Sequence, residues 1–336
     1  MGRLYSYGAQ GPRESSTRIQ VATIGCGQGG VANVGRRPTN YNRIVPELPD
    51  LTILADAFAA ALIGRRVLAA EAPGPLTVRG TPAELDALTG QRLERFYRRG
   101  KFLWLDFDRD RVVINAMLTG RLQLAADPSA RKPQKTLFIL RFGARESAPA
   151  GEAAWTDGAP WIPAANATPE VRYRDPTQMG KVYLVPRGVD RAIPGTGPDE
   201  MGPDADDPGL TLEAWRGRIL RHPGELKNLL RNQEFIAGIG NAYSDEILYA
   251  ARLLPTRKRG TLAPEEVDEL YQATRATLAN AIAVLRERVP PNFETEVRDF
   301  LAVHNKGGQA CPRCDGRITQ TEAGGFTTSY CRHCQH

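Results

Sequence analysis

The feature that most constrains this chain is a set of four cysteines close to its C-terminal end. They stand within the last 26 residues as two Cys-x-x-Cys pairs, with 16 residues between the pairs. Four thiolates complete the tetrahedral shell of a zinc ion, and each Cys-x-x-Cys turn directs two sulfurs at the same ion. We therefore predict one structural Zn²⁺, bound by Cys311, Cys314, Cys331 and Cys334.

The segment between the two pairs predicts the shape of this metal site. Residues 316–330 contain β-type side chains on either side of the turn Gly324-Gly325, as the hairpin of a zinc ribbon does. The clustering of the thiols favours a metal site in a reducing compartment over a disulfide framework. We therefore expect a cytoplasmic protein.

Length and charge set limits on the remaining function classes. The 336 residues suggest two domains with appendages, and no apolar run reaches the roughly 18 residues that a membrane-spanning helix needs, so we expect no membrane role. Residues 1–44 contain six arginines, no lysine and one acidic residue, which leaves 38 basic against 37 acidic residues in the rest. Net charge by itself is therefore weak evidence for binding of nucleic acid.

The first half of the chain predicts a β-rich domain, residues 46–186, with one helix packed on it. Apolar residues at three-to-four spacing predict a helix over Asp50–Ile63, and Thr81–Leu88 reads as a short helix with Thr81 as its cap. Residues 143–170, rich in Ala and Pro, read as a loop inserted in a hairpin. Turn residues separate the predicted strands Arg66–Glu71, Arg92–Tyr97, Phe102–Phe107, Val112–Met117, Leu122–Ala125, Thr136–Phe142, Val171–Tyr173 and Lys181–Val185.

The second half predicts a helical domain. Residues 187–210 are rich in Gly, Pro and Asp and read as a linker between the domains. A helical domain over 211–301 and the ribbon over 302–336 follow, so the predicted fold class is α+β. The helices expected after the linker are Leu212–Arg221, Leu226–Leu230, Ala242–Ala251, Ala263–Arg288 and Phe293–Phe300.

A glycine–asparagine turn precedes the third of these helices. Gly238, Gly240 and Asn241 open the helix, where backbone N–H groups at the positive end of the dipole suit a phosphate. The glycines permit a close approach of the backbone, and Asn241 either caps the helix or donates to the phosphate. Any helix–turn–helix can use such a turn, so the motif alone does not establish DNA binding.

From Pro46 onward, the chain resembles the formamidopyrimidine-DNA glycosylase and endonuclease VIII family. The resemblance covers residues 46–336 in order, apart from the insert 143–170. It implies a two-sheet β-sandwich, a helix–two-turn–helix domain and a zinc ribbon. The motifs that carry it are Pro46–Asp50, Arg98–Phe102, Leu118–Leu122, Tyr173–Gly180, the turn Gly238–Asn241 and the cysteine tail.

The resemblance implies a bifunctional DNA glycosylase and abasic-site lyase of base excision repair. Its partner is double-stranded DNA with a damaged base or abasic site, and a monomer is expected. Pro46 is the implied nucleophile, Glu47 the acid/base, Lys101 a ligand of the phosphate next to the lesion, and Asp50 a supporting residue. The implied DNA contacts are Gly240 and Asn241, with Leu118, Gln178 and Met179 filling the gap left by the flipped base.

This chemistry requires Pro46 to carry a free secondary amine. An internal proline, acylated by Val45, has no basic nitrogen and cannot form the iminium of amine catalysis. We therefore expect residues 1–45 to be an over-extended or removed segment, with Val45 corresponding to a GTG start codon. An organelle transit peptide is a less favoured alternative, because amphipathic helical spacing is absent.

Three departures from the family pattern bear on DNA binding and specificity. Many members carry an arginine that grips the lesion phosphate five residues before the third zinc ligand, where this chain has Phe326, and Lys306 or Arg332 are candidate substitutes. The trio of gap-filling residues, Leu118, Gln178 and Met179, also differs from the trios that are usual in the family. The segment between the last long helix and the ribbon is short, which favours oxidised pyrimidines or ring-opened purines over 8-oxoguanine.

Two other functions remain open at this point. A non-catalytic damaged-DNA-binding paralogue would keep the helix–turn and the ribbon, and Phe326 favours it, whereas Glu47 and Lys101 favour the enzyme. A zinc ribbon associated with the ribosome or with transcription would leave the N-terminal half unexplained.

Overall fold

The computed structural model describes residues 45–147 and 153–336. The predicted extension 1–45 therefore lies, except for Val45, outside the described residues. Within the described ranges, no helix is both long and apolar enough to cross a membrane.

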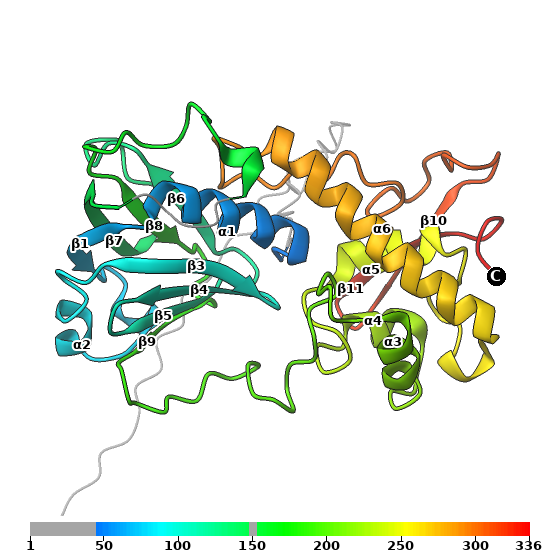
Figure 1. The fold of residues 1–336 in the computed structure, drawn as a ribbon. Helices are drawn as coiled ribbons and strands as arrows, with labels where there is room; N and C mark the ends of the chain where they lie inside the picture. Colours follow the sequence, from blue (N-terminus) through cyan, green and yellow to red (C-terminus); the bar gives the residue numbers. More distant parts are fainter. Residues whose placement is uncertain (1–44, 148–152) are drawn as a thin grey trace, which may run out of the picture. The chain divides into compact units, whose positions relative to one another are not determined.

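The first element, α1 (Leu48–Leu62), begins two residues before the helix that the sequence predicts. Pro49 lies in its first turn, where a missing N–H costs no hydrogen bond. The helix ends just before Gly64, whose φ of +82° is strained for other residues. Figure 1 shows α1 lying along β3 (Leu93–Arg99), and Glu47 and Asp50 lie at the N-terminal end of α1.

Two sheets form the β-sandwich that was predicted. Apart from a parallel pair formed by β2 (Val78–Arg79), the strands pair antiparallel. The apolar faces of both sheets and of α1 share one core, with Phe58, Leu103, Phe138 and Val171 fully buried. One sheet has the order β1 (Arg65–Glu71), β7 (Thr136–Arg145), β8 (Glu170–Arg174), β6 (Arg121–Ala125), and the other has β2, β9 (Lys181–Val185), β5 (Arg111–Asn115), β4 (Phe102–Phe107), β3.

Short elements outside the sheets agree with the turn chemistry of the sequence. The short helix α2 (Pro82–Asp86) is capped by Thr81, which accepts from the Glu84 N–H while Glu84 accepts from the Thr81 N–H. A 3-10 turn, η1 (Pro75–Thr77), precedes β2. Residues 143–145 belong to β7, so the inserted loop is shorter than predicted, and its described part contains η2 (Ala154–Thr156).

The helical domain packs around a second core that includes Trp215, Phe235 and Tyr243. The long helix α6 packs against both α1 and α5 (Figure 1). The predicted helix Phe293–Phe300 is wrong, because this segment forms turns held by side-chain contacts with α1. The elements are α3 (Leu212–Ile219), α4 (Leu226–Arg231), α5 (Asn241–Ala250), η3 (Arg259–Thr261) and α6 (Pro264–Arg288).

The C-terminal ribbon is the predicted hairpin, formed by β10 (Ile318–Ala323) and β11 (Phe326–Cys331). Gly324 and Gly325 make its turn, both with positive φ. The strand β11 packs against α5, and it thereby brings the ribbon onto the helix that the glycine–asparagine turn opens.

Candidate active site

The carboxylate of Glu47 lies at the N-terminus of α5. It accepts hydrogen bonds from the backbone N–H groups of Gly240 (2.6 Å), Ala242 (2.8 Å) and Tyr243 (3.2 Å). These are orphan donors of the helix end, and they suit an acid. Residues 193 positions apart thus join the start of the β domain to the glycine–asparagine turn.

The two glycines of that turn allow this contact. A Cβ on Gly240 would lie 2.5 Å from the Glu47 carboxyl carbon. Gly238 has a φ of +102°, and its carbonyl accepts from the Leu48 N–H at 2.9 Å. The sequence therefore needs glycine at both positions so that α1 can dock on the turn.

Asp50 supports Glu47 from the first turn of α1. Its carboxylate accepts the Glu47 N–H at 2.9 Å and forms an ion pair with Arg298, which also donates to the Tyr243 hydroxyl at 2.9 Å. Arg298 comes from the segment after α6, and nothing in the sequence motifs singled it out. The pair fixes the chain directly after Pro46 against both α5 and that segment.

Pro46 and Lys101 line one recess of about 230 Å³. Asn115, Met117 and Gln233 also line it. Burial lowers the pKa of Lys101, the charge of Glu47 counteracts this, and Arg231 lowers it further. The structure thus brings the predicted nucleophile and the predicted phosphate ligand together, beside the predicted acid/base.

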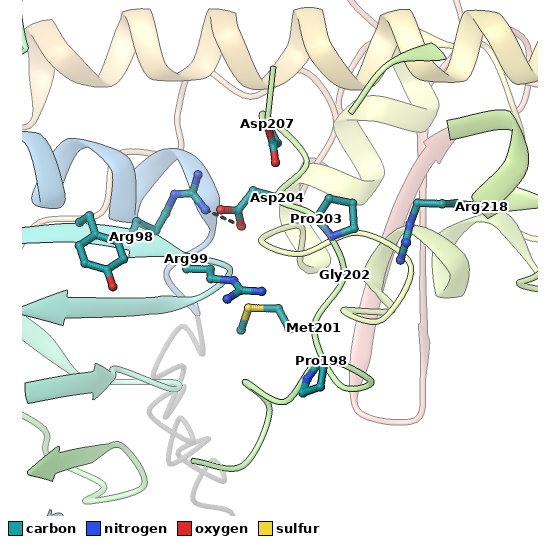
Figure 2. A pocket seen from close by; sticks show the side chains of 10 residues that line it. Arg98, Arg99, Pro198, Met201, Gly202, Pro203, Asp204, Asp207 and Arg218 are labelled. Atoms are coloured by element: carbon teal, nitrogen blue, oxygen red, sulfur yellow. Dashed lines mark ion pairs between the residues drawn. The ribbon is translucent and has the colours of Figure 1, made fainter. Parts of the chain in front are cut away.

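The turn that bears Lys101 is clamped by the segment read as a linker. Arg98 forms ion pairs with Asp204 (2.9 Å) and Asp206 (2.7 Å), and the Gly100 N–H donates to Asp204 at 2.6 Å. Figure 2 shows Arg98 and Asp204 facing each other across this contact, with Met201 beside the turn. Part of the 187–210 segment is therefore docked structure that helps to position Lys101.

The three predicted gap-filling residues lie on two loops that hydrogen bonds join. Thr119, next to Leu118, donates to Asp175, which also accepts the N–H groups of Thr177 (3.1 Å) and Gly180 (2.8 Å). Gln178 and Met179 lie on the second of these loops. Gln178 has a positive φ of +56°, and 44% of the surface of Met179 is exposed.

Asn241 is not the cap of α5, contrary to one of the two predicted roles. Gly240 is the N-cap, because the carboxylate of Glu47 already takes the free N–H groups. The Asn241 amide instead donates to the Thr327 carbonyl of β11 at 2.9 Å, and its own side-chain oxygen is buried without a partner among the described residues. That oxygen is a free acceptor for a hydrogen-bond donor of a ligand at this position.

Lys227, on α4, reaches the same carbonyl and was missed by the sequence motifs. Its ammonium donates to the Thr327 carbonyl at 2.8 Å and to Asp245 at 2.6 Å. Burial lowers the pKa of Lys227, and Asp245 counteracts this. Asp245 also binds His304 and the Ser329 N–H, so the ribbon is held to α5 by a buried polar network.

The four predicted cysteine ligands converge on one point. Their sulfurs all lie within 4.8 Å of one another, with pairs at 3.8 Å (Cys311 and Cys334) and 3.7 Å (Cys314 and Cys331). A tetrahedral ion with metal–sulfur bonds of about 2.3 Å places sulfurs about 3.8 Å apart. The cluster therefore has the donor set and spacing to hold one metal ion.

Comparison with known proteins agrees with this geometry. Residues 45–182 match the formamidopyrimidine-DNA glycosylase N-terminal domain, and residues 201–289 match the formamidopyrimidine-DNA glycosylase H2TH domain. The formamidopyrimidine-DNA glycosylase of Heliobacterium modesticaldum is 31% identical over 299 residues, which are 87% of this chain and 100% of that protein. The glycosylase of Pelotomaculum thermopropionicum is 28% identical, with 87% and 99% of the two chains covered.

Solved structures share the fold. A complex between the Lactococcus lactis Fpg and DNA with an abasic site has a TM-score of 0.71 at 22% identity, covering 86% of this chain and 99% of that one. A complex of the LlFpg protein with a THF-DNA and an inhibitor gives 0.72 at 22% identity, covering 87% and 100%. With the matched domains and the relative in Heliobacterium, these findings show that the chain belongs to the formamidopyrimidine-DNA glycosylase family.

Proposed function

We propose that this protein is a bifunctional DNA glycosylase and abasic-site lyase of base excision repair. The observation that carries the proposal is the position of Pro46 in one recess with Lys101, directly before a Glu47 carboxylate held by three N–H groups. A protein that only bound damaged DNA would need neither a proline there nor a buried carboxylate beside it.

The proposed reaction begins with a free amine at Pro46. The Pro46 nitrogen attacks C1′ of the damaged nucleoside, the bond from C1′ to the base breaks, and the nitrogen loses its proton. Cleavage of the C1′–O4′ bond, with a proton delivered to O4′, then opens the sugar ring and forms the iminium between C1′ and the Pro46 nitrogen. The iminium withdraws electrons, so that loss of the C2′ proton releases the 3′ phosphate. The Glu47 carboxylate would move the protons of ring opening and elimination, and Lys101 would bind the phosphate beside the lesion.

The active form would begin at Pro46. The relatives in Pelotomaculum and Heliobacterium are matched over 99% and 100% of their own length, whereas 87% of this chain takes part, which supports a catalytic unit that begins near Pro46. Borohydride trapping on a duplex with an abasic site tests the chemistry. Protein that begins at Pro46 should be captured covalently, and the 336-residue form should not.

The same assay tests the non-catalytic alternative. A Pro46→Gly variant at the same start keeps an amino terminus but replaces the secondary amine, so it should be trapped more slowly. Failure of the Pro46 form to give any adduct, with binding of damaged DNA retained, would support a binding protein and reject the lyase. Intact mass of the native protein establishes where its chain begins.

We further propose Zn²⁺ as the metal of the cysteine cluster and a cytoplasmic location. Four thiolates at the spacing of the cluster favour zinc, and reduced cysteines require a reducing compartment.

For the substrate we propose oxidised pyrimidines or ring-opened purines. Excision rates on defined lesion duplexes test this preference, and a strong selectivity for 8-oxoguanine would contradict it.

A further inference from the structure

Arg231, the last residue of α4, stacks on an aromatic ring of the ribbon. Its guanidinium carbon lies 3.7 Å from the ring centroid of Phe326, the first residue of β11. Phe326 is 47% exposed on the ribbon. Within the described part of the chain, the Arg231 guanidinium has no hydrogen-bond acceptor, so its N–H donors face solvent or a ligand.

The stack lies next to the predicted DNA-binding residues. Lys227 precedes Arg231 by one helical turn, and both Lys227 and Asn241 donate to the carbonyl of Thr327, the neighbour of Phe326. We call Lys227, Arg231, Asn241 and Phe326 the phosphate cluster. These contacts come from three elements that meet at the N-terminus of α5.

Electrostatics extend this cluster to the catalytic residues. Burial lowers the pKa of Arg231, and the charges of Glu47 and Asp245 counteract the shift. Burial is the main cause of the lowered pKa of Lys101, and the charge of Arg231 lowers this pKa further. Arg231 therefore lies within electrostatic reach of the acid/base and of the predicted phosphate ligand.

Neither candidate substitute from the sequence takes this position. The Lys306 ammonium donates to the Asp299 carbonyl at 3.0 Å, and Arg332 is exposed on the ribbon, with no described contact to the cluster. The ribbon position of the missing arginine is instead covered from α4, by a guanidinium whose flat face rests on the phenyl ring.

We propose that Arg231, oriented by its stack on Phe326, binds a backbone phosphate of the DNA beside the lesion. A stacked guanidinium keeps its donors at the ring edge, where they match two phosphate oxygens. The positive charge that the family pattern places on the ribbon is thus supplied from helix α4 in this chain. This proposal rests on the proposed function only in that the ligand is lesion DNA.

Binding of a duplex with a tetrahydrofuran abasic analogue tests the charge. The protein used is the form that begins at Pro46, with variants Arg231→Met and, as a control on the same ribbon, Arg332→Met. We expect Arg231→Met to weaken binding roughly 10- to 100-fold and to reduce the slope of log affinity against log salt by about 0.9, whereas Arg332→Met changes neither. An unchanged slope in Arg231→Met would overturn the proposal.

Neutral methylphosphonates, placed one at a time around the abasic analogue, identify the phosphate. Wild-type protein should lose affinity at the contacted position, and Arg231→Met should lose nothing further there while keeping its losses elsewhere. Losses that add at every position would show that Arg231 contacts no phosphate. A tetrahydrofuran site cannot form the iminium, so this result is independent of trapping, and a failure of the lyase proposal remains distinguishable.

Exchange of the two side chains tests the stack. Phe326→Leu should weaken binding part of the way, because the guanidinium loses its support. The double variant Arg231→Met with Phe326→Arg should recover affinity and the salt slope, because it returns one charge to the same phosphate from the ribbon. Wild-type affinity in Phe326→Leu, or no recovery in the double variant, would contradict the stacking arrangement.

Discussion

Gly240 and Glu47 are so close that no side chain fits between them. A Cβ on Gly240 would lie 2.5 Å from the carboxyl carbon of Glu47 and 2.7 Å from one of its oxygens. The contact holds the proposed acid/base against the N-terminus of α5, and it depends on glycine for space. Glycine at position 240 therefore both allows α1 to pack on α5 and keeps the proposed acid/base in place, and a substitution at this position tests the second role.

We expect Gly240→Ala to displace the Glu47 carboxylate and slow excision about 100-fold, since a shift of about 1 Å in a catalytic group costs that much. Single-turnover excision on a damaged duplex measures the effect. Gly217→Ala is the matched control: nothing lies within 4 Å of its added Cβ, and alanine favours helix α3. Equal rates in the two variants would contradict the role of the contact.

The clamp on the Lys101 turn predicts a graded loss of stability. Arg98 has 8% of its side chain exposed, so Arg98→Gln leaves the half-buried Asp204 carboxylate without its cation and should cost about 3 kcal/mol of unfolding free energy. Asp206→Asn, at a position 29% exposed, should cost less than about 1 kcal/mol. Denaturant titrations measure both, and equal losses would show that the clamp is not organised around Asp204.

Glu296 predicts a pH dependence of stability. Burial raises its pKa to about 8, although Arg121 counteracts the shift. Between the unfolded value and about 8 the folded state holds a proton that the unfolded state releases, so stability falls as the pH rises through this window. Glu296→Gln removes this titrating group and with it the pH-dependent contribution to stability.

The stability difference between Glu296→Gln and wild type should therefore shift in favour of the variant from pH 6 to pH 9, by on the order of a few kcal/mol. Because both proteins share every other titrating group, the difference isolates Glu296. Parallel stability curves across this range would refute the shifted titration.

Local pattern predicted most of the elements, because alternation and turn residues dominate in the strands. Phe102–Phe107 and Lys181–Val185 have the predicted bounds, and Thr81 caps α2 as expected. The prediction of a helix over Phe293–Phe300 failed because tertiary contacts override helical spacing: the Phe293 ring packs edge-on against Phe58, and Arg298 pairs with Asp50.

The candidate site was predictable only where a motif carries it. Pro46, Glu47, Lys101 and the cysteines stand in motifs, and the structure places them together in their groups. A single arginine at the end of a short helix carries no such pattern, so Arg231 emerges only from its stack on Phe326. Asn241 was assigned as a possible cap because the sequence does not show that Glu47 reaches the same helix end.

The ribbon is small, so we expect its fold to depend on the proposed metal ion. Its buried cluster consists of Val303, Ile318 and two of the cysteines together with Tyr249 of α5, which is less apolar surface than an independent unit needs. An ion bound by the four cysteines would therefore hold β11, whose Thr327 carbonyl accepts hydrogen bonds from Lys227 and Asn241. Loss of the ion should release these two side chains and Phe326 together.

Removal of the metal with a chelator should accordingly abolish tight binding of abasic-analogue DNA while the β-sandwich stays folded. Metal analysis should give one zinc per chain before treatment, and circular dichroism should show retained strand signal afterwards. Addition of Zn²⁺ should restore binding, because the four cysteines are near one another in the sequence and can bind the ion again. Full affinity in the metal-free protein would mean that the hairpin and its contacts to α4 and α5 persist without the ion.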